Sequence, residues 1–132
     1  AMKDLLQSLK EKVTLGIITN GPAQHQWDKV NALGLKEWIP VGHIFISGAL
    51  GVAKPDKRIF SRAADRLGIL PEEICYVGDS FENDIAGAKA AGWNAIWYNH
   101  RGHKATGDVK PDEIVTSEEE LIACLEKIST KE

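Results

Sequence analysis

Cysteine is scarce in this sequence, which has only Cys75 and Cys124 among its 132 residues. Two cysteines are too few for the framework of several disulfides that holds small secreted domains together. Each lies inside an apolar run, EEICYVG or ELIACLEKI, where a free thiol usually packs as a small core side chain. We expect both cysteines to be reduced core residues.

Long apolar runs and an excess of positive charge are also lacking. No stretch approaches the roughly 20 apolar residues of a membrane span, and the start, AMKDLLQSLKEK, lacks the apolar centre of a secretory signal. The formal net charge is -3 and the pI is about 5.8, with Lys and Glu interspersed. We therefore expect a cytoplasmic protein that binds neither membranes nor nucleic acid.

What the sequence does have is a regular alternation of short apolar runs with segments of helical period, separated by turns that contain Gly or Pro. This alternation is typical of a parallel sheet covered by helices on both faces. Hydrophobic residues make up 43% of the chain, enough for one core. We predict one three-layer α/β/α Rossmann-like domain, with strands at 13–19, 43–47, 74–78, 94–99 and 113–116 and helices at 3–12, 23–33, 56–67, 84–92 and 118–128.

Three polar residues follow successive predicted strands: Thr19, Lys54 and Asp79. The carboxyl edge of an open α/β sheet, where these residues fall, is the usual place for ligands. Asp84 comes five residues after Asp79, so the loop GDSFEND can fold both carboxylates toward one point. We expect these four side chains to form one site.

The chemistry of these residue types is that of a phosphate bound with a hard cation. Mg²⁺ takes one or two protein carboxylates, keeps several waters and binds substrate phosphate oxygens. Asp79 is the expected direct ligand, and Asp84 is expected to bind through water or to orient the other ligands. Lys54 would neutralise phosphate charge. These residues predict a magnesium-dependent phosphoryl-transfer site.

The Thr19 hydroxyl and the backbone N–H groups of Asn20 and Gly21 are the expected donors to phosphate oxygens, because they precede a predicted helix. Each motif also has a simpler interpretation. TNG is a common turn with a helix cap, KPD is a common helix start, and a carboxylate in GDSFEND can cap a loop. It is the order of the motifs and their placement at strand ends that favour the site.

Other polar and aromatic residues are assigned no role in this site. His100 and His103 lie in a polar loop with no expected carboxylate partner, so we interpret them as surface residues. The four tryptophans are spaced irregularly and are interpreted as packing residues rather than as a platform for stacking bases: Trp27, Trp38, Trp93 and Trp97.

The segments IITNG, GVAKPD and YVGDSFENDI resemble the second, third and fourth signature motifs of the haloacid dehalogenase superfamily, in the family's order. The wording of GVAKPDKRIF and VGDSFENDIAGAKAAG is similar to the phosphatase and 5′-nucleotidase-like branch. The resemblance implies a magnesium-dependent phosphatase that acts on a small phosphorylated metabolite through an aspartyl-phosphate. It assigns phosphate binding to Thr19, charge balance to Lys54, magnesium to Asp79 and the acidic companion to Asp84.

The family's first motif, an apolar strand ending in DxD, has no counterpart in residues 1–132. Its leading aspartate is the nucleophile and its second aspartate is the general acid and base. The cap that selects the substrate is missing as well. We therefore expect a partial catalytic core that is inactive alone, with magnesium binding that survives at best in part.

In the family, the strand of the first motif lies between the strands that end here at Thr19 and Asp79. Without it, these two strands pair directly or expose their edges to another chain. The alternative function is therefore a binding or assembly module that forms a homodimer or a strand-swapped oligomer. Ala1 before Met2 resembles a cloning scar, and a designed truncation, proteolysis and a natural start at Met2 remain open.

Overall fold

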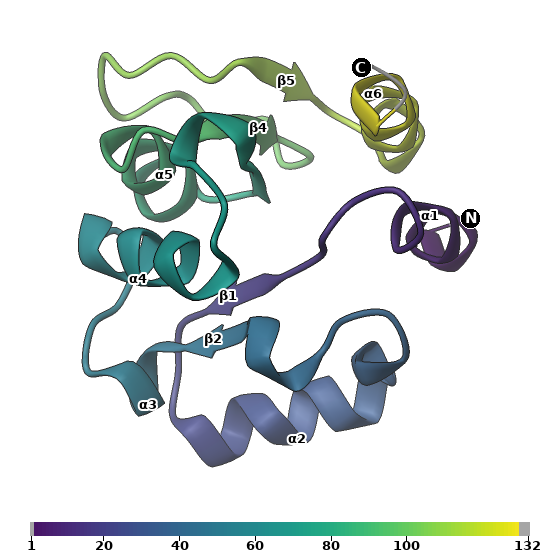
Figure 1. Cartoon of the computed structure of the whole chain (residues 1–132). Helices are drawn as coiled ribbons and strands as arrows, with labels where there is room; N and C mark the ends of the chain where they lie inside the picture. Colours follow the sequence, from purple (N-terminus) through teal and green to yellow (C-terminus); the bar gives the residue numbers. More distant parts are fainter. Residues whose placement is uncertain (1, 130–132) are drawn as a thin grey trace.

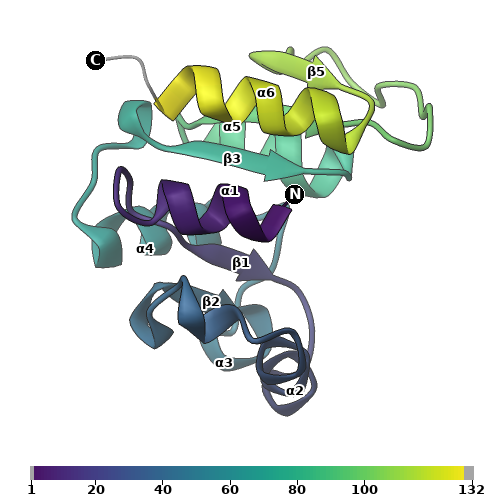
Figure 2. The ribbon, with the colours of Figure 1, turned by 90° about the vertical axis from the view of Figure 1, so that its right-hand side faces the viewer.

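A computed structural model describes residues 2–129 and shows helices on both faces of a central layer of parallel strands (Figures 1 and 2). Each strand is only three to five residues long. They are β1 (Ile17–Thr19), β2 (Ile44–Ile46), β3 (Cys75–Gly78), β4 (Asn94–Tyr98) and β5 (Glu113–Val115). The helices are α1 (Met2–Leu9), α2 (Ala23–Leu33), α3 (Ser47–Leu50), α4 (Lys57–Leu67), α5 (Gly87–Ala90) and α6 (Glu118–Ser129).

Two separate sheets make up the strand layer. In the first sheet β1 pairs with β2, and in the second the order is β3-β4-β5. All pairs are parallel, with Thr19 opposite Ile46 and Gly78 opposite Trp97. Among residues 2–129, β1 and β3 each have one edge without a strand partner. Of the two alternatives, direct pairing of β1 with β3 does not form.

One apolar core continues from the first sheet to the second beneath α4 and α5. Phe60 of α4 is fully buried and makes edge-to-face contacts with Tyr76 and Trp93, with ring centroids 5.3 and 5.2 Å apart. Burying such a side chain contributes roughly 1.5–3 kcal/mol. The buried members of this first core are Ile18, Phe45, Val52, Ile59, Phe60, Ala63, Ala64, Phe81, Ile85, Ala88, Trp93, Ala95 and Trp97.

The opposite face of the strand layer carries two apolar clusters instead of one. The cluster beside the first sheet consists of Val30, Trp38, Ile39, Ile44 and Ile46, and the cluster beside the second consists of Ile96, Val115 and Leu121. Helix α1 lies across both, because its Leu6 packs against the first cluster and its Met2 against the second. The two sheets therefore share a continuous core on only one face.

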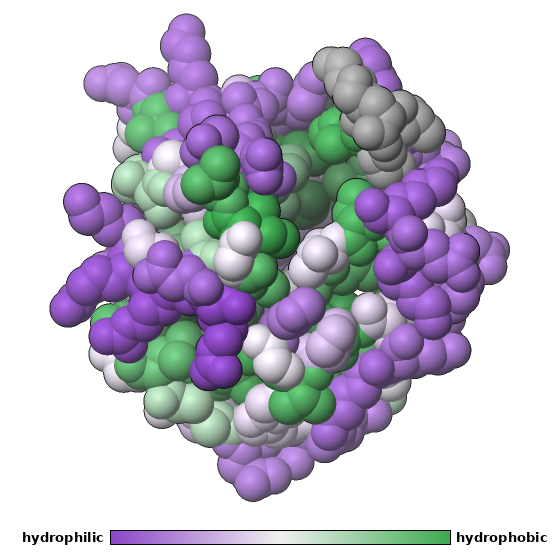
Figure 3. Space-filling model, in the orientation of Figure 1, coloured by the Kyte–Doolittle hydropathy of each residue, from purple (hydrophilic) through white to green (hydrophobic). Residues whose placement is uncertain are grey.

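Figure 3 shows a hollow bordered by hydrophobic residues on the face seen in Figure 1.

The four longer helices carry buried apolar side chains on one side and exposed polar ones on the other, as expected for helices that cover a sheet. α4 begins after Asp56, whose carboxylate accepts from Arg58 N at 2.9 Å, and ends before Gly68. These caps fix the segment that leads into the helix, which contains Lys54.

The predicted α/β/α fold is confirmed, but several predicted elements are too long or of the wrong kind. The first strand begins at Ile17 rather than Val13, since residues before Ile17 have no paired strand. The predicted helix at 84–92 is a π-helical turn, η4 (Phe81–Ala86), followed by α5. The loop expected after β2 contains the short helix α3, and 3₁₀ turns occur at Leu35–Glu37, Val41–His43 and Pro71–Glu73.

The cysteines are free thiols and half-buried, and desolvation raises the pKa of Cys75 to about 11. Trp38, Trp93 and Trp97 are buried and Trp27 packs against the first sheet's cluster, so the prediction that the tryptophans are packing residues is confirmed. No helix within residues 2–129 is long and apolar enough to cross a membrane.

Candidate active site

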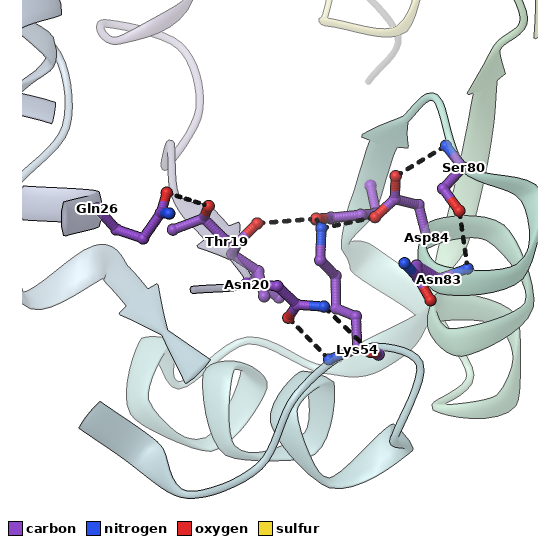
Figure 4. A network of polar contacts seen from close by, with 9 residues as sticks. Thr19, Asn20, Gln26, Lys54, Ser80, Asn83 and Asp84 are labelled. Carbon is purple, nitrogen blue, oxygen red and sulfur yellow. Dashed lines mark hydrogen bonds and ion pairs between the residues drawn. The ribbon is translucent and has the colours of Figure 1, made fainter. Parts of the chain in front are cut away.

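Lys54 and Asp84 form a buried ion pair at the carboxyl edge of the strands (Figure 4). Lys54 Nζ lies 2.7 Å from Asp84 Oδ1, and the two side chains are only 13% and 6% exposed. Lys54 Nζ also donates to the Tyr76 hydroxyl at 3.1 Å, and that hydroxyl donates to the Ile18 carbonyl oxygen at 3.1 Å. This chain of contacts joins the second sheet to the first across the unpaired edges.

Burial and charge act in opposite directions on Lys54. Desolvation alone would lower the pKa of its ammonium group, but Tyr76 and Asp84 more than offset this and raise it overall. Burial also raises the pKa of Tyr76, to about 12. Lys54 is therefore a cation, and Tyr76 a neutral hydroxyl, at any physiological pH.

Asp84 is held by the turn that carries it. Its Oδ2 accepts from Ser80 N at 3.1 Å, and Ser80 Oγ in turn accepts from Asn83 N at 3.1 Å. A Cβ atom on Gly78 would lie 2.3 Å from the Asp84 Cβ, so only glycine allows the end of β3 to approach this side chain. With both oxygens engaged, Asp84 is placed to orient Lys54.

Thr19 is the last residue of β1, as the sequence predicts, and its hydroxyl donates to Gln26 Oε1 at 3.0 Å. Gln26 is only 7% exposed and shares the buried face of α2 with Val30. The amide thus fixes the rotamer of Thr19 and leaves the hydroxyl oxygen with acceptor capacity.

Asn20 connects the end of β1 to the backbone of Lys54. Its amide accepts from Lys54 N at 3.0 Å and donates to Lys54 O at 3.1 Å, a reciprocal pair visible in Figure 4. The Gly21 N–H donates to Ser47 Oγ at 2.8 Å, so a phosphate bound there would compete with this hydroxyl. The structure therefore brings Thr19, Asn20, Gly21 and Lys54 together.

Asp79 follows β3, and its contacts within residues 2–129 are with residues on β4 and the loop after it rather than with the ion pair. Its side chain is 52% exposed, its Oδ2 lies 3.6 Å from His100 Nε2, and its carbonyl oxygen accepts from Trp97 Nε1 at 3.1 Å. The interpretation of His100 as a histidine without a carboxylate partner is wrong. Within residues 2–129, Asp79 contacts His100 and Trp97, whereas Asp84 contacts Lys54 and Ser80, so the two carboxylates have different partners. Their convergence on one cation stays a prediction.

The fit of these residues to a magnesium ion is partial. Over residues 2–129, no group of three or more His, Cys, Asp or Glu side chains is placed to hold a metal. Asp79 offers one exposed carboxylate, whereas Asp84 is committed to Lys54 and Ser80. One carboxylate with waters is a chemically reasonable magnesium site, but a weak one unless other ligands join it.

Gln26, Ser47, Tyr76 and His100 contact the predicted site residues and were not found from the sequence. Tyr76 looks like an ordinary aromatic residue in an apolar strand, and its hydroxyl matters only because β3 faces β1. The spacing of Gln26 gives one indication that it is buried, because it lies four residues before Val30 and so on the same face of α2.

Comparison with known proteins gives a consistent result. A sequence model of a haloacid dehalogenase-like hydrolase family matches residues 1–92. Glyceraldehyde 3-phosphate phosphatase of Pyrococcus furiosus is 36% identical over 131 residues, which cover 96% of this chain and 53% of that protein. N-acylneuraminate-9-phosphatase of Mus musculus is 35% identical over 132 residues, or 98% of this chain and 52% of the relative.

Solved structures agree with these sequence relatives. A HAD phosphatase from Thermococcus onnurineus superposes with a TM-score of 0.82 at 32% identity, covering 98% of this chain and 56% of that one. A 2-haloacid dehalogenase from Pseudomonas syringae pv. Tomato gives a TM-score of 0.80 at 34% identity, covering 96% and 52%. The chain thus spans about half the length of each of the four proteins named above.

Proposed function

From the premise that this chain belongs to the haloacid dehalogenase-like hydrolase family, we propose that it forms part of the catalytic core of a phosphatase for small phosphorylated metabolites. The observation that carries the proposal is the buried ammonium group of Lys54, held at the carboxyl edge beside Thr19 and Asn20. The curated relatives named above are phosphatases, which supports phosphate esters as the substrate class.

Each site residue has a role that its contacts support. Lys54 supplies a fixed positive charge to the transferring phosphoryl group, and Asp84 and Tyr76 hold it in place. The Thr19 hydroxyl would donate to a phosphate oxygen after turning its proton away from Gln26 Oε1. The backbone N–H groups of Asn20 and Gly21 would donate at the start of α2, that of Gly21 in place of its bond to Ser47 Oγ. Such preorganised donors are typically worth several kcal/mol of transition-state stabilisation.

Asp79 is the residue that would hold magnesium, with Asp84 acting at most through water. When bound, the ion would neutralise charge on the phosphate oxygens. Asp79 could bind the ion with one carboxylate oxygen while its Oδ2 keeps the contact with His100.

The nucleophile is proposed to come from outside residues 1–132. No acidic side chain lies on β1, and the unpaired edges of β1 and β3 flank the bridge formed by Lys54 and Tyr76. A strand inserted between these edges would satisfy the free backbone groups of both and deliver its last residue to Lys54. Residues 1–132 alone are then expected to be inactive.

A second candidate function follows from the same edges. If another copy of this chain covers them, the domain is an assembly module that dimerises through its sheets. Analytical ultracentrifugation separates the two functions: a monomer whose Tm rises with phosphate supports the phosphatase core, whereas an obligate dimer indifferent to phosphate and magnesium supports the module.

The activity itself is tested with a chimaera in which this chain replaces the matching half of the Pyrococcus furiosus phosphatase. We expect magnesium-dependent phosphate release from a generic aryl phosphate, reduced at least 100-fold by Lys54→Ala or Asp79→Asn. Glu37→Gln, a carboxylate change far from the site in sequence and contacts, is the matched control.

A folded chimaera without activity, alongside an active parent enzyme, contradicts the proposal. Residues 1–132 are assayed in parallel with their own Asp79→Asn variant. Turnover by the unmodified chain that the variant lacks contradicts the missing nucleophile, and means that a carboxylate or activated water within residues 1–132 attacks the phosphate.

A further inference from the structure

Gln26 is a buried polar residue that uses only one end of its side-chain amide. It lies on the buried face of α2, is 7% exposed, and accepts from the Thr19 hydroxyl through Oε1 at 3.0 Å. Its Nε2 group, which carries two N–H donors, makes no hydrogen bond within residues 2–129. Most buried polar side chains have all their polar atoms bonded, so this unused donor is an exception.

The unused end of the amide lies against the loop after β1. Gly21 has a φ of +147°, and a Cβ atom there would collide with Gln26 Nε2. The amide can therefore reach this position only because residue 21 has no side chain. Figure 4 shows Gln26 reaching from α2 to Thr19, next to Asn20. The donor thus lies beside the groups that are proposed to bind phosphate.

The Thr19 hydroxyl has a single proton, and two acceptors would compete for it. In the structure Gln26 Oε1 receives the proton, and a bound phosphate oxygen would take it away. If nothing else changed, Thr19 Oγ and Gln26 Oε1 would then face each other at 3.0 Å with no proton between them. Such a contact is repulsive, and it leaves the buried amide oxygen without a donor.

We propose that the Gln26 amide turns over when phosphate binds, so that Nε2 donates to Thr19 Oγ while the Thr19 hydroxyl donates to a phosphate oxygen. The oxygen and nitrogen of a side-chain amide have nearly the same size, so Nε2 would take the place of Oε1 at a similar distance. The proposal rests on the proposed phosphatase function. It makes Gln26 a positioning residue that acts through Thr19.

The chemistry of glutamine suits this role better than that of other side chains of similar length. A glutamate carboxylate could only accept from Thr19, and a methionine could neither accept nor donate. The terminal torsion of glutamine is broad and roughly two-fold, so turning the amide costs little. A hydroxyl that accepts from Nε2 also becomes a stronger donor to the anion, because hydrogen bonds in a chain polarise one another.

The test follows the two Nε2 protons of Gln26 in a proton–nitrogen NMR correlation spectrum of the chain, with inorganic phosphate as the probe. The signals of this group are those missing from the spectrum of Gln26→Met. At phosphate saturation we expect one Nε2 proton to move downfield and to exchange more slowly with water, together with shifts of the Asn20 and Gly21 backbone N–H signals. In Thr19→Val, saturated with phosphate, the Nε2 signals should stay where they are in the free protein.

Phosphate affinity gives a second readout that separates turning from simple acceptance. If the amide kept its orientation, Gln26→Met would remove a competitor for the Thr19 proton and strengthen binding. We expect Gln26→Met instead to weaken binding roughly threefold to tenfold, as for the loss of one neutral hydrogen bond, and to have no further effect in Thr19→Val. Gln24→Met is the matched control, because Gln24 is an exposed residue of α2 bonded to Asp28, and it should bind phosphate as tightly as the unmodified chain.

Each other outcome contradicts a defined part of the proposal. Backbone shifts without an Nε2 shift, or a Gln26→Met variant that binds phosphate as tightly as the unmodified chain or more tightly, refute the turning amide and leave the phosphatase function standing. An Nε2 shift that persists in Thr19→Val means that Gln26 donates to the anion directly, which refutes a role through Thr19. If phosphate moves none of these signals, the phosphate site itself is refuted and the turning amide falls with it.

Discussion

At the scale of single residues, the site depends on one cation with several partners. Lys54 is tied through its backbone to Asn20 and through its side chain to Asp84 and Tyr76. Burying each of these charges costs desolvation free energy, and only the attraction between the two charges offsets that cost. If one charge is removed, the other stays buried without compensation. Removing one member is therefore far more damaging than removing both.

Lys54→Met is expected to destabilise the fold by about 3 kcal/mol or more, since it leaves the Asp84 carboxylate buried and unpaired. The double variant Lys54→Met/Asp84→Asn is expected to recover part of this loss. Urea unfolding followed by circular dichroism measures both. Arg58→Met, in the exposed pair with Asp56, is the matched control and should change stability little. Equal losses of stability in Lys54→Met and Arg58→Met would refute the structural role of the buried ion pair.

The raised pKa values of Lys54 and Tyr76 predict a loss of stability at alkaline pH. A lysine whose folded pKa is raised stabilises the fold below its unfolded pKa, near 10.4, and loses this contribution as pH rises through the folded value. Tyr76 acts in the same direction between its unfolded pKa of about 10 and its folded pKa of about 12.

For Tyr76 alone, the free energy of unfolding is expected to fall by roughly 1 kcal/mol by pH 11. Unfolding in urea at pH 8, 10 and 11 gives the profile. Tyr76→Phe should flatten the tyrosine part of it, and a profile that is equally steep in Tyr76→Phe would assign the effect to other groups.

The sequence offers Thr19, Lys54, Asp79 and Asp84 as candidates because charge and strand-end position are visible in a linear pattern. It missed Gln26, Ser47 and Tyr76, since their roles depend on which faces of α2, α3 and β3 meet. It also missed the pairing of His100 with Asp79, which needs the loop after β4 to fold back. Polar residues at strand ends can thus be predicted from the sequence, whereas the residues that hydrogen-bond to them cannot.

At the scale of elements, the helices were located better than the strand ends. Capping residues such as Asp56 mark where α4 begins, whereas β1 begins only at Ile17, opposite the first residue of β2, which no local pattern reveals. The sequence predicts a regular helix at 84–92, whereas residues 84–86 are the end of the π-helical turn and α5 covers only Gly87–Ala90.

Close packing between α3 and the loop after β1 gives a prediction at this scale. A Cβ atom on Gly48 would lie 2.6 Å from the Gly21 carbonyl oxygen and 2.8 Å from Ala23 N, and backbone cannot move aside as a side chain can. Gly48→Ala is therefore expected to cost about 1–3 kcal/mol by overpacking. It should also weaken phosphate binding, because the Gly21 segment shifts.

Gly42→Ala is the control for this substitution, since a Cβ atom there would meet nothing within 4 Å. Chemical denaturation and phosphate titration of the two variants are compared. A Gly48→Ala protein as stable as the Gly42→Ala protein, with unchanged phosphate affinity, would show that α3 does not support the loop.

At the scale of the whole molecule, the two sheets share one core under α4 and α5 and are separate on the other face. Hydrogen exchange should report this asymmetry. Backbone N–H groups of β4, which pairs on both sides, are expected to exchange most slowly, and those on the unpaired edges of β1 and β3 much faster. Slow exchange on both edges in the purified chain would indicate that a second copy covers them.

The overall architecture followed from the sequence because alternation of apolar runs and helical periods is a property of the whole chain. The division into two sheets did not follow from that alternation, since the pattern that predicts β1 and β3 says nothing about which neighbours they have. Only the absence of an apolar strand ending in DxD pointed to a gap between them.

The bridge from Lys54 through Tyr76 to Ile18 has one more consequence. The ammonium group that is proposed to bind phosphate also connects the two sheets to each other. A bound anion would therefore compete with Asp84 and Tyr76 for the charge of Lys54. Tight anion binding would weaken the contacts that connect the first sheet to the second. A segment that held the two sheets together independently would free more of the Lys54 charge for the anion, so completing the sheet would also strengthen phosphate binding.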